Sequence, residues 1–198
     1  MGQCLKIKYD KSIPVAARLK KEAESRIEKA LNSTSFKKLS RKQIRQRENL
    51  YNEKKNVAAI IYDDTILVAH SSVSGKGNIY HPFFVLETEG RYPFTDVKVS
   101  PFKEINTEDG WERQKDCEAK LLIYLAKTVL KMNASGKIDL YTKFEPCLGC
   151  DNYIIQFLKL FKDIDINIYW EYPYPSIKKY DDFNRAKRLR FMSKSREV

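Results

Sequence analysis

Two cysteines separated by two residues, Cys147 and Cys150, form the most informative motif of the 198-residue sequence. Pro146 precedes them, and proline is favoured in the first turn of a helix. A helix that begins near Pro146 would point both sulfur atoms in the same direction, so that one metal ion could bind both. Thiolate sulfur is a preferred ligand of zinc. The motif therefore predicts a metal site at the start of a helix.

A second group with metal-site chemistry lies upstream, in the triplet Asp116-Cys117-Glu118. In zinc-dependent deaminases, a metal ligand is followed two residues later by a glutamate that transfers protons without binding the metal. The usual ligand at this position is His or Cys, whereas this chain has Asp116. Cys117 is an alternative third ligand, because a thiolate suits zinc better than a carboxylate does. Only Asp116 has the register that places Glu118 two residues further on.

The two motifs together predict a zinc-dependent hydrolytic deaminase, in which Glu118 would take a proton from water and return it to the substrate. The spacing of Cys147 and Cys150 is also typical of thioredoxin-like redox sites and of structural zinc ribbons. A ribbon needs a second cysteine pair, and a redox site would explain neither acidic residue of the upstream triplet. A non-catalytic zinc or redox module therefore remains as an alternative.

Hydrophobic periodicity predicts an alternation of strands and helices around these motifs. A β-hairpin is expected first, with strands over 56–62 and 65–69 joined at Asp63-Asp64; a helix over 116–130, a strand over 137–144, a helix over 151–161 and a strand over 165–170 follow. The last connections are long enough for parallel pairing. The order predicts a three-layer α/β/α fold with a mixed sheet, in which both motifs lie at helix starts.

Several of these stretches resemble the deaminase domains of bacterial polymorphic toxins, within the cytidine deaminase-like superfamily. The matching pieces are NVA from Asn56, AHSS over 69–72, GWERQKDCEAKLL over 110–122, GKIDLYTKFEPCLGC over 136–150 and IIQF over 154–157. The resemblance implies the cytidine deaminase-like fold and the hydrolytic loss of an exocyclic amine from a nucleobase. It also implies aspartate at the first metal position, in agreement with Asp116.

Three further residues, Asn56, His70 and Ser72, align with parts of that pattern near the expected pocket. The resemblance makes them candidate substrate-binding residues. Asn56 would form a hydrogen bond with the sugar or the base, or it caps the hairpin strand. His70 would stack on a flipped base or bind it, although a histidine at a strand end also suits a structural role.

The net charge of +11 is distributed unevenly along the chain. Residues 1–55 contain 16 Lys and Arg against 6 acidic residues, residues 173–198 contain 8 against 3, and residues 56–172 contain 13 against 17. A polyanion would explain the basic flanks, because neutralised phosphates release counterions and strengthen binding. Solvated surface and an acidic protein partner are the alternatives. The charge therefore favours nucleic acid as the partner.

The remaining composition narrows the class of protein. No window approaches the length of a transmembrane helix, and the first residues lack the apolar core of a signal peptide. Four cysteines, two of them in the metal motif, do not form a disulfide framework. We expect a soluble monomer without membrane contact, in the cytoplasm or delivered into a target cell's cytoplasm as a toxin, and an immunity protein is a candidate partner.

These observations predict three parts: a basic helical extension over 1–52, a zinc-dependent deaminase domain over 53–175, and a basic C-terminal helix or tail over 176–198. The expected reaction is the conversion of cytosine to uracil in DNA, single- or double-stranded, or in RNA. Deamination of adenine in RNA or DNA and deamination of free nucleosides remain as alternatives. The motifs themselves do not distinguish between the bases.

Overall fold

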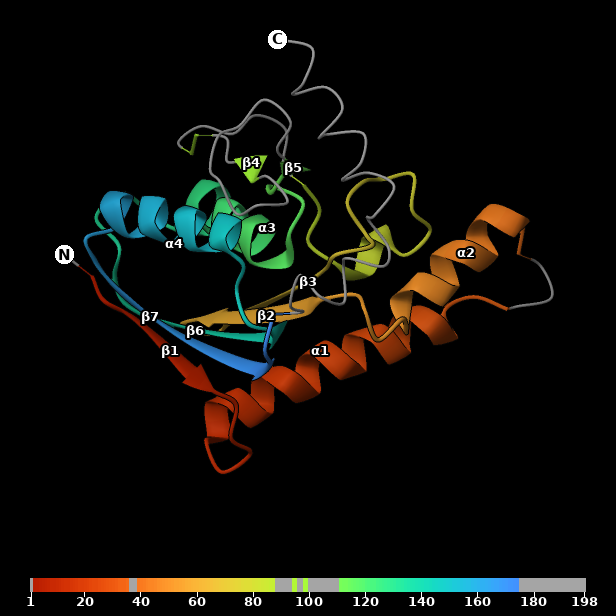
Figure 1. Ribbon diagram of the computed structural model, residues 1–198, viewed down its shortest axis with the longest axis horizontal. Coiled ribbons are helices and arrows are strands. Elements are labelled where there is room, and N and C mark those ends of the chain that lie inside the picture. Colours follow the sequence, from red (N-terminus) through yellow and green to blue (C-terminus); the bar gives the residue numbers. More distant parts are fainter. Residues whose placement is uncertain (1, 36–38, 88–93, 96–97, 100–110, 175–198) are drawn as a thin grey trace, which may run out of the picture.

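A five-stranded mixed sheet forms the centre of the protein, seen in the computed structural model of Figure 1. The structure describes residues 2–35, 39–87, 94–95, 98–99 and 111–174. The strands lie in the order β1 (Cys4–Lys8), β7 (Asp163–Tyr172), β6 (Ser135–Phe144), β2 (Val57–Tyr62) and β3 (Thr65–His70). β2 pairs antiparallel with β3 and β6, whereas β7 pairs parallel with β6 and β1. The predicted mixed sheet is confirmed.

Helices cover both faces of this sheet (Figure 1). α1 (Pro14–Asn32) lies along one face and is followed by α2 (Arg41–Leu50), while α3 (Cys117–Tyr124) and α4 (Leu148–Leu160) lie on the other. Shorter elements are the 3-10 helix His81–Phe83, the π-helical turn Leu125–Val129 that continues α3, and the strands β4 (Lys98–Val99) and β5 (Trp111–Glu112), which pair with each other. The α/β class with three layers is thus confirmed.

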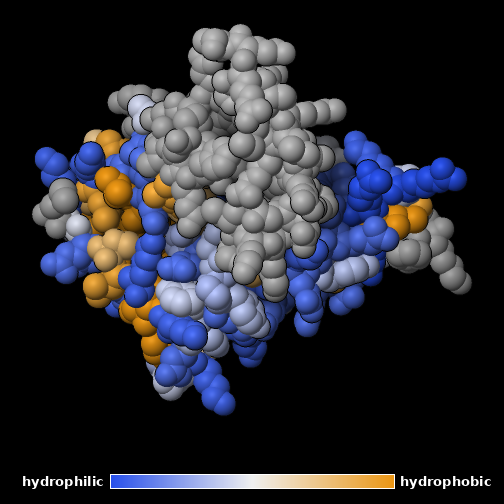
Figure 2. Space-filling model, in the orientation of Figure 1, coloured by the Kyte–Doolittle hydropathy of each residue, from blue (hydrophilic) through white to orange (hydrophobic). Residues whose placement is uncertain are grey.

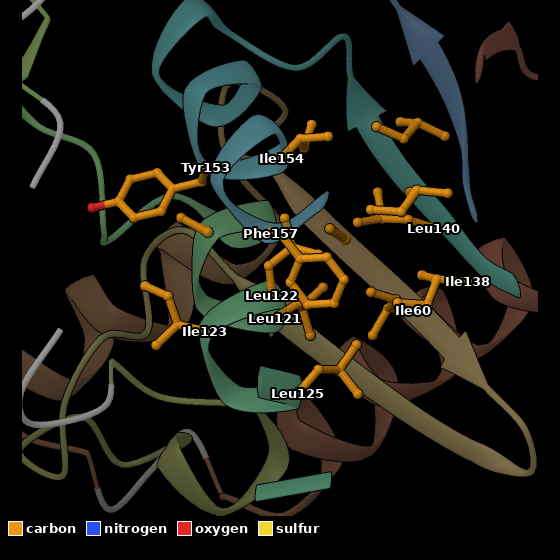
Figure 3. Packing of buried hydrophobic residues seen from close by; sticks show 14 of the residues in the cluster. Ile60, Leu121, Leu122, Ile123, Leu125, Ile138, Leu140, Tyr153, Ile154 and Phe157 are labelled. Atoms are coloured by element: carbon orange, nitrogen blue, oxygen red, sulfur yellow. The ribbon is translucent and has the colours of Figure 1, made fainter. Parts of the chain in front are cut away.

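The larger apolar core lies between the sheet and the helices α3 and α4, as shown in Figure 3. Ile60, Ile138 and Leu140 contribute from the strands, and Leu122 and Phe157 contribute from the two helices. Because side chains alternate along a strand, the neighbours of these strand residues point the other way. Burial of both helices against the sheet fixes the position of their first turns, and these first turns carry the two sequence motifs.

The first 52 residues contribute more than a helical extension. Strand β1 extends the sheet at its edge, and the buried side chains Leu19, Ala23 and Ala30 of α1 belong to the second core, beneath the opposite face. The sequence prediction missed β1 because its partner strand lies about 160 residues later in the chain. Lys6 and Lys8 on β1 are exposed, as is common on edge strands.

The character of the surface differs between the two ends of the molecule. Figure 2 shows apolar surface gathering at the end where α4 and the N-terminus lie, whereas the surface over α2 is mostly hydrophilic. Leu5 on β1 and Ile155 on α4 are more than half exposed. Among the described residues, none of the helices combines the length and the apolar character needed to cross a membrane. The predicted C-terminal helix or tail over 176–198 lies outside the described residues.

Candidate functional site

The two cysteines of the C-x-x-C motif lie at the start of α4. Cys147 is the residue that precedes the first helical turn, with extended backbone angles φ −74° and ψ 166°, and its Sγ accepts a hydrogen bond from the Cys150 backbone N–H at 3.4 Å. The two Sγ atoms are 3.4 Å apart. The helix begins at Leu148, so Pro146 lies outside it rather than in its first turn. The predicted common direction of the two sulfur atoms is nevertheless present.

Asp116 approaches these cysteines from the start of α3. It occupies the N-cap position with extended angles φ −68° and ψ 151°, where an aspartate side chain ordinarily accepts a backbone hydrogen bond. Its carboxylate makes no such bond. Instead, Asp116 Oδ2 lies 3.3 Å from Cys147 Sγ and 3.6 Å from Cys150 Sγ. The aspartate side chain therefore faces the two thiols and leaves the helix terminus uncapped.

The three side chains have the chemistry and spacing of a zinc site. Their donor atoms all lie within 4.8 Å of one another, and no other group of three such residues was found within the described part of the chain. Tetrahedral zinc with ordinary ligand distances requires donors about 3.6–3.8 Å apart. Two of the observed distances, 3.3 and 3.4 Å, are slightly shorter, and the third, 3.6 Å, lies within this range. The donor set of two sulfurs and one carboxylate suits zinc. The residues present thus fit the metal that the sequence predicts.

Glu118 lies beside this triad and is buried, with 2% of its surface exposed. Its Oε2 is 3.4 Å from Cys150 Sγ. Its Oε1 accepts hydrogen bonds from the Thr142 hydroxyl at 2.7 Å and from Asn56 Nδ2 at 3.0 Å. Burial raises the pKa of Glu118, and the Thr142 hydrogen bond opposes that rise. A buried carboxyl group with a raised pKa is suited to exchange protons near neutral pH.

Asn56 orients this carboxyl group from the start of β2. Its side-chain oxygen accepts the Phe144 backbone N–H at 3.2 Å, which directs the amide nitrogen towards Glu118 and Thr142. The amide of Asn56 is thus part of the hydrogen-bond network around Glu118. A contact with substrate remains a prediction for this residue.

Cys117, the alternative third ligand, lies apart from the triad. Its thiol is fully buried and donates a hydrogen bond to the Asn56 carbonyl oxygen at 3.2 Å. Burial raises the pKa of Cys117 well above its ordinary value, which favours the protonated thiol. Of the two candidates, the geometry therefore brings Asp116 to Cys147 and Cys150.

His70 and Ser72 do not join Glu118. His70 follows Val68 by two positions on β3, and Val68 belongs to the core beneath α1, on the face of the sheet opposite Glu118. His70 Nδ1 accepts the Ser72 backbone N–H at 3.2 Å and lies 2.8 Å from the Ser72 hydroxyl, while the ring contacts Phe84. Burial lowers the pKa of His70 to about 3. His70 thus lies on the face of the sheet opposite Glu118, and its contact with a base stays a prediction.

A cavity of about 260 Å³ lies on this opposite face. Its lining includes His70, Lys55 and Lys143, together with Glu24 and Glu28 of α1. Lys143 Nζ donates to the Glu53 carbonyl oxygen at 2.9 Å. The cavity is separated by the sheet from the residues around Glu118.

Three residues at or near the site escaped the sequence prediction: Thr142, Lys120 and Arg113. A threonine in a strand gives no signal of its own, and an arginine three positions before Asp116 resembles any surface pair. Lys120 did give a signal, because it interrupts an apolar helical stretch. It is 1% exposed, and its Nζ donates to the carbonyl oxygens of His70 at 2.6 Å and Val73 at 2.7 Å. Lys120 thereby ties the end of β3 to α3.

The sequence is similar to a known protein family over most of its length. A sequence model of a toxin-deaminase family, the BURPS668_1122 family of deaminases, matches residues 17–171. The chain belongs to this family. No curated protein matches the sequence. The membership confirms the resemblance to toxin-type deaminases and makes hydrolytic deamination the reaction class of the chain.

The extent of the family match agrees with the fold. It begins within α1 and ends within β7, so the toxin-deaminase unit includes both helices that precede the hairpin. The sequence prediction assigned these helices to an extension over 1–52. The match stops before the basic run at the C-terminus. Toxin-type deaminases are usually zinc-dependent, in agreement with the triad of Asp116, Cys147 and Cys150.

Proposed function

We propose that this toxin-type deaminase uses zinc to convert cytosine to uracil within nucleic acid. The observation that carries the proposal is the convergence of Asp116, Cys147 and Cys150 beside the buried carboxyl group of Glu118. Two helix starts meet at this point, and the positive ends of their dipoles favour anionic ligands. The proposed metal ligands are the three residues of this triad, and the proposed proton carrier is Glu118.

Each residue has a distinct role in the proposed reaction. Zinc, when bound, supplies a Lewis acid that lowers the pKa of water at the site. Glu118 accepts a proton from the attacking water, and passes protons to a ring nitrogen and to the departing amine, so that water and the amino base yield the keto base and ammonia. Thr142 and Asn56 hold the Glu118 carboxyl group in place through their hydrogen bonds.

The charge distribution supports nucleic acid as the substrate. Arg41, Lys42 and Arg45 are exposed on α2, where the surface is hydrophilic (Figure 2). Arg47 has a structural role instead, because its guanidinium donates to the Leu31 carbonyl oxygen at 2.6 Å. The basic residues between 178 and 196 lie outside the described residues. A basic surface binds phosphates with release of counterions, so binding should weaken as salt increases.

The substrate base must leave the stack before it can reach a buried glutamate. Single-stranded DNA or RNA offers such a base at the smallest cost, and duplex DNA offers it only after the base is flipped out. Cytosine is the proposed base. Adenine is its competitor, because the chemistry of water, metal and glutamate is the same for both.

The deciding experiment combines metal analysis with sequencing of treated nucleic acid. Purified protein is analysed for zinc and incubated with single-stranded DNA, duplex DNA and RNA pools, which are then sequenced for C-to-T and A-to-G changes. The matched control is Glu118→Ala, which should retain zinc and fold but change no base. Free cytidine and adenosine are tested in parallel by ammonia release.

The outcomes separate the proposals. C-to-T changes that disappear with the control and decline at high salt support the proposed function. A-to-G changes would show that the substrate base is adenine rather than cytosine. Ammonia from free nucleosides at a rate insensitive to salt would reject nucleic acid as the substrate. Zinc-free protein with a reversible disulfide between Cys147 and Cys150 would indicate a redox module.

A further inference from the structure

Arg113 is a cation placed against the candidate metal ligands. Its Nη1 lies 3.5 Å from Asp116 Oδ2, the same oxygen that lies 3.3 Å from Cys147 Sγ. The Arg113 and Asp116 side chains are 16% and 29% exposed. The pair is therefore more sheltered from water than an ordinary surface ion pair, whose energetic contribution is small.

The C-x-x-C loop is shaped to admit this arginine. Gly149 lies between the two cysteines, and a Cβ atom built on it would overlap with Cγ of Arg113 and would lie 2.9 Å from its Cβ. A side chain at position 149 would therefore displace the stem of Arg113. The glycine allows the arginine stem to pack directly on the first turn of α4, which brings the guanidinium to Asp116.

The electrostatics explain why a cation is needed here. Two thiolates and one carboxylate carry three negative charges, so a zinc ion would leave the centre with one excess negative charge. The more usual set of one histidine and two cysteines leaves none. An arginine guanidinium stays protonated in proteins. At 3.5 Å from Asp116 Oδ2, the charge of Arg113 offsets the excess.

We propose that Arg113 is a positioning residue that makes an aspartate usable as the third zinc ligand, by orienting Asp116 and by balancing its charge. The proposal rests on the proposed zinc-dependent function. It predicts that Arg113 contributes to zinc affinity only while the third ligand is an anionic side chain such as Asp116. Partners that orient a ligating side chain typically change metal affinity about 10–100-fold when removed.

Zinc affinity in four proteins tests this dependence. Wild type, Arg113→Met, Asp116→His and the double variant are titrated with zinc in competition with a chromogenic chelator. Methionine keeps much of the apolar stem and removes the charge. We expect Arg113→Met to weaken zinc binding about tenfold beside Asp116 and less than about twofold beside the substituted histidine. An equal change in both backgrounds, or none in either, would overturn the proposal.

A second measurement covers the case in which Asp116→His does not fold. Cobalt replaces zinc in wild type, Arg113→Met and Arg113→Lys, and the visible absorption bands report the ligand geometry. We expect the methionine variant to shift these bands and the lysine variant, which keeps the charge, to restore at least half of the shift and of the lost affinity. Identical spectra in all three proteins would reject a positioning role.

These results are distinguishable from a failure of the proposed function. A wild-type protein that binds no zinc and deaminates nothing would remove the basis of both proposals. A wild-type protein that binds zinc and deaminates, but shows no coupling between positions 113 and 116, would reject the inference on Arg113 alone.

Discussion

The two faces of the sheet differ sharply at the end where β2, β3 and β6 approach the candidate site. On the face covered by α3 and α4, Asn56 and Thr142 converge on Glu118. On the face covered by α1, Val57 and His70 lie directly opposite each other across the hairpin. Adjacent residues of one strand thus belong to a candidate catalytic network on one side and to a structural core on the other.

Both faces bury a titratable group, and burial favours the neutral form of each. It raises the pKa of Glu118 and lowers the pKa of His70 to about 3. The surroundings then separate the two residues. Glu118 contacts Cys150 of the candidate metal triad, whereas His70 contacts Ser72 and the ring of Phe84. Burial of an ionisable group therefore indicates a catalytic role only in combination with its neighbours.

The largest expected effect distinguishes these two buried groups. Glu118→Gln keeps the shape of the side chain but removes its capacity to accept a proton, so we expect deamination to fall about 10²–10⁴-fold. His70→Gln on the opposite face should lower the rate less than about tenfold. The measurement is the initial rate of deamination at equal zinc content, with circular dichroism as the control for folding. Comparable losses in both variants would contradict the division between the faces.

A second comparison uses two buried cysteines near Glu118: Cys150, which contacts its carboxyl group, and Cys117, which precedes it in the chain. Cys150 lies in the candidate triad and Cys117 donates a hydrogen bond to the Asn56 carbonyl. Cys150→Ser should lower zinc affinity about 100-fold or more, because a neutral serine hydroxyl is a far poorer zinc ligand than a thiolate. Cys117→Ser keeps a donor for the same carbonyl and should retain zinc.

Zinc content after dialysis, with affinity by chelator competition, checks this prediction. Loss of zinc from the Cys117 variant, with zinc retained in the Cys150 variant, would exchange the roles of the two residues. Loss of zinc from both variants would instead indicate Cys117 as the third ligand in place of Asp116.

The third expected effect concerns the network that holds Glu118. Thr142→Val is nearly isosteric and removes the hydroxyl that lies 2.7 Å from Glu118 Oε1. A hydrogen bond to a charged group contributes about 1.5–3 kcal/mol, so we expect kcat to fall about tenfold or more. Thr142→Ser retains the hydroxyl and should recover most of that loss. Steady-state kinetics at unchanged zinc content makes the measurement, and equal rates in the valine and serine variants would remove Thr142 from the network.

Sequence reasoning predicted those parts of the fold that local periodicity determines. The hairpin, both helices that carry the motifs, and strands β6 and β7 all follow from apolar spacing. Strand β1 did not, since only its distant partner β7 makes it a strand. The cysteine and aspartate positions were predictable because metal chemistry restricts their spacing, whereas Thr142 is recognisable only once β6 lies beside α3.

The face of the sheet on which His70 lies is predictable from the sequence of the hairpin. A two-residue turn at Asp63 and Asp64 pairs Tyr62 with Thr65, and counting outward from that pair places His70 opposite Val57. Residues directly opposite on antiparallel strands share one face. His70 therefore could not share a face with Asn56, the neighbour of Val57. The family resemblance placed His70 near the site residues along the sequence. Strand pairing determines the face of the sheet to which its side chain points, and that face is opposite Glu118.

The smallest expected effect tests the structural role of His70 through the pH dependence of stability. The folded-state pKa of about 3 lies below the ordinary histidine value of 6.5, so the unfolded chain binds more protons than the folded chain between these values. The contribution of neutral, buried His70 to the free energy of unfolding is therefore present in full above pH 6.5, and it declines as the pH falls from 6.5 towards 3. Between pH 7.5 and 5.5, His70 should cost about 1.4 kcal/mol of the free energy of unfolding.

Urea unfolding of wild type and His70→Asn at both pH values isolates this contribution. Other groups, including the metal ligands, titrate alike in both proteins and cancel in the comparison. We expect the asparagine variant to lose about 1.4 kcal/mol less than wild type on acidification, even though its stability at pH 7.5 is lower. A parallel decline in both proteins would show that His70 accepts a proton in the folded state, and would place it in contact with water rather than within the core.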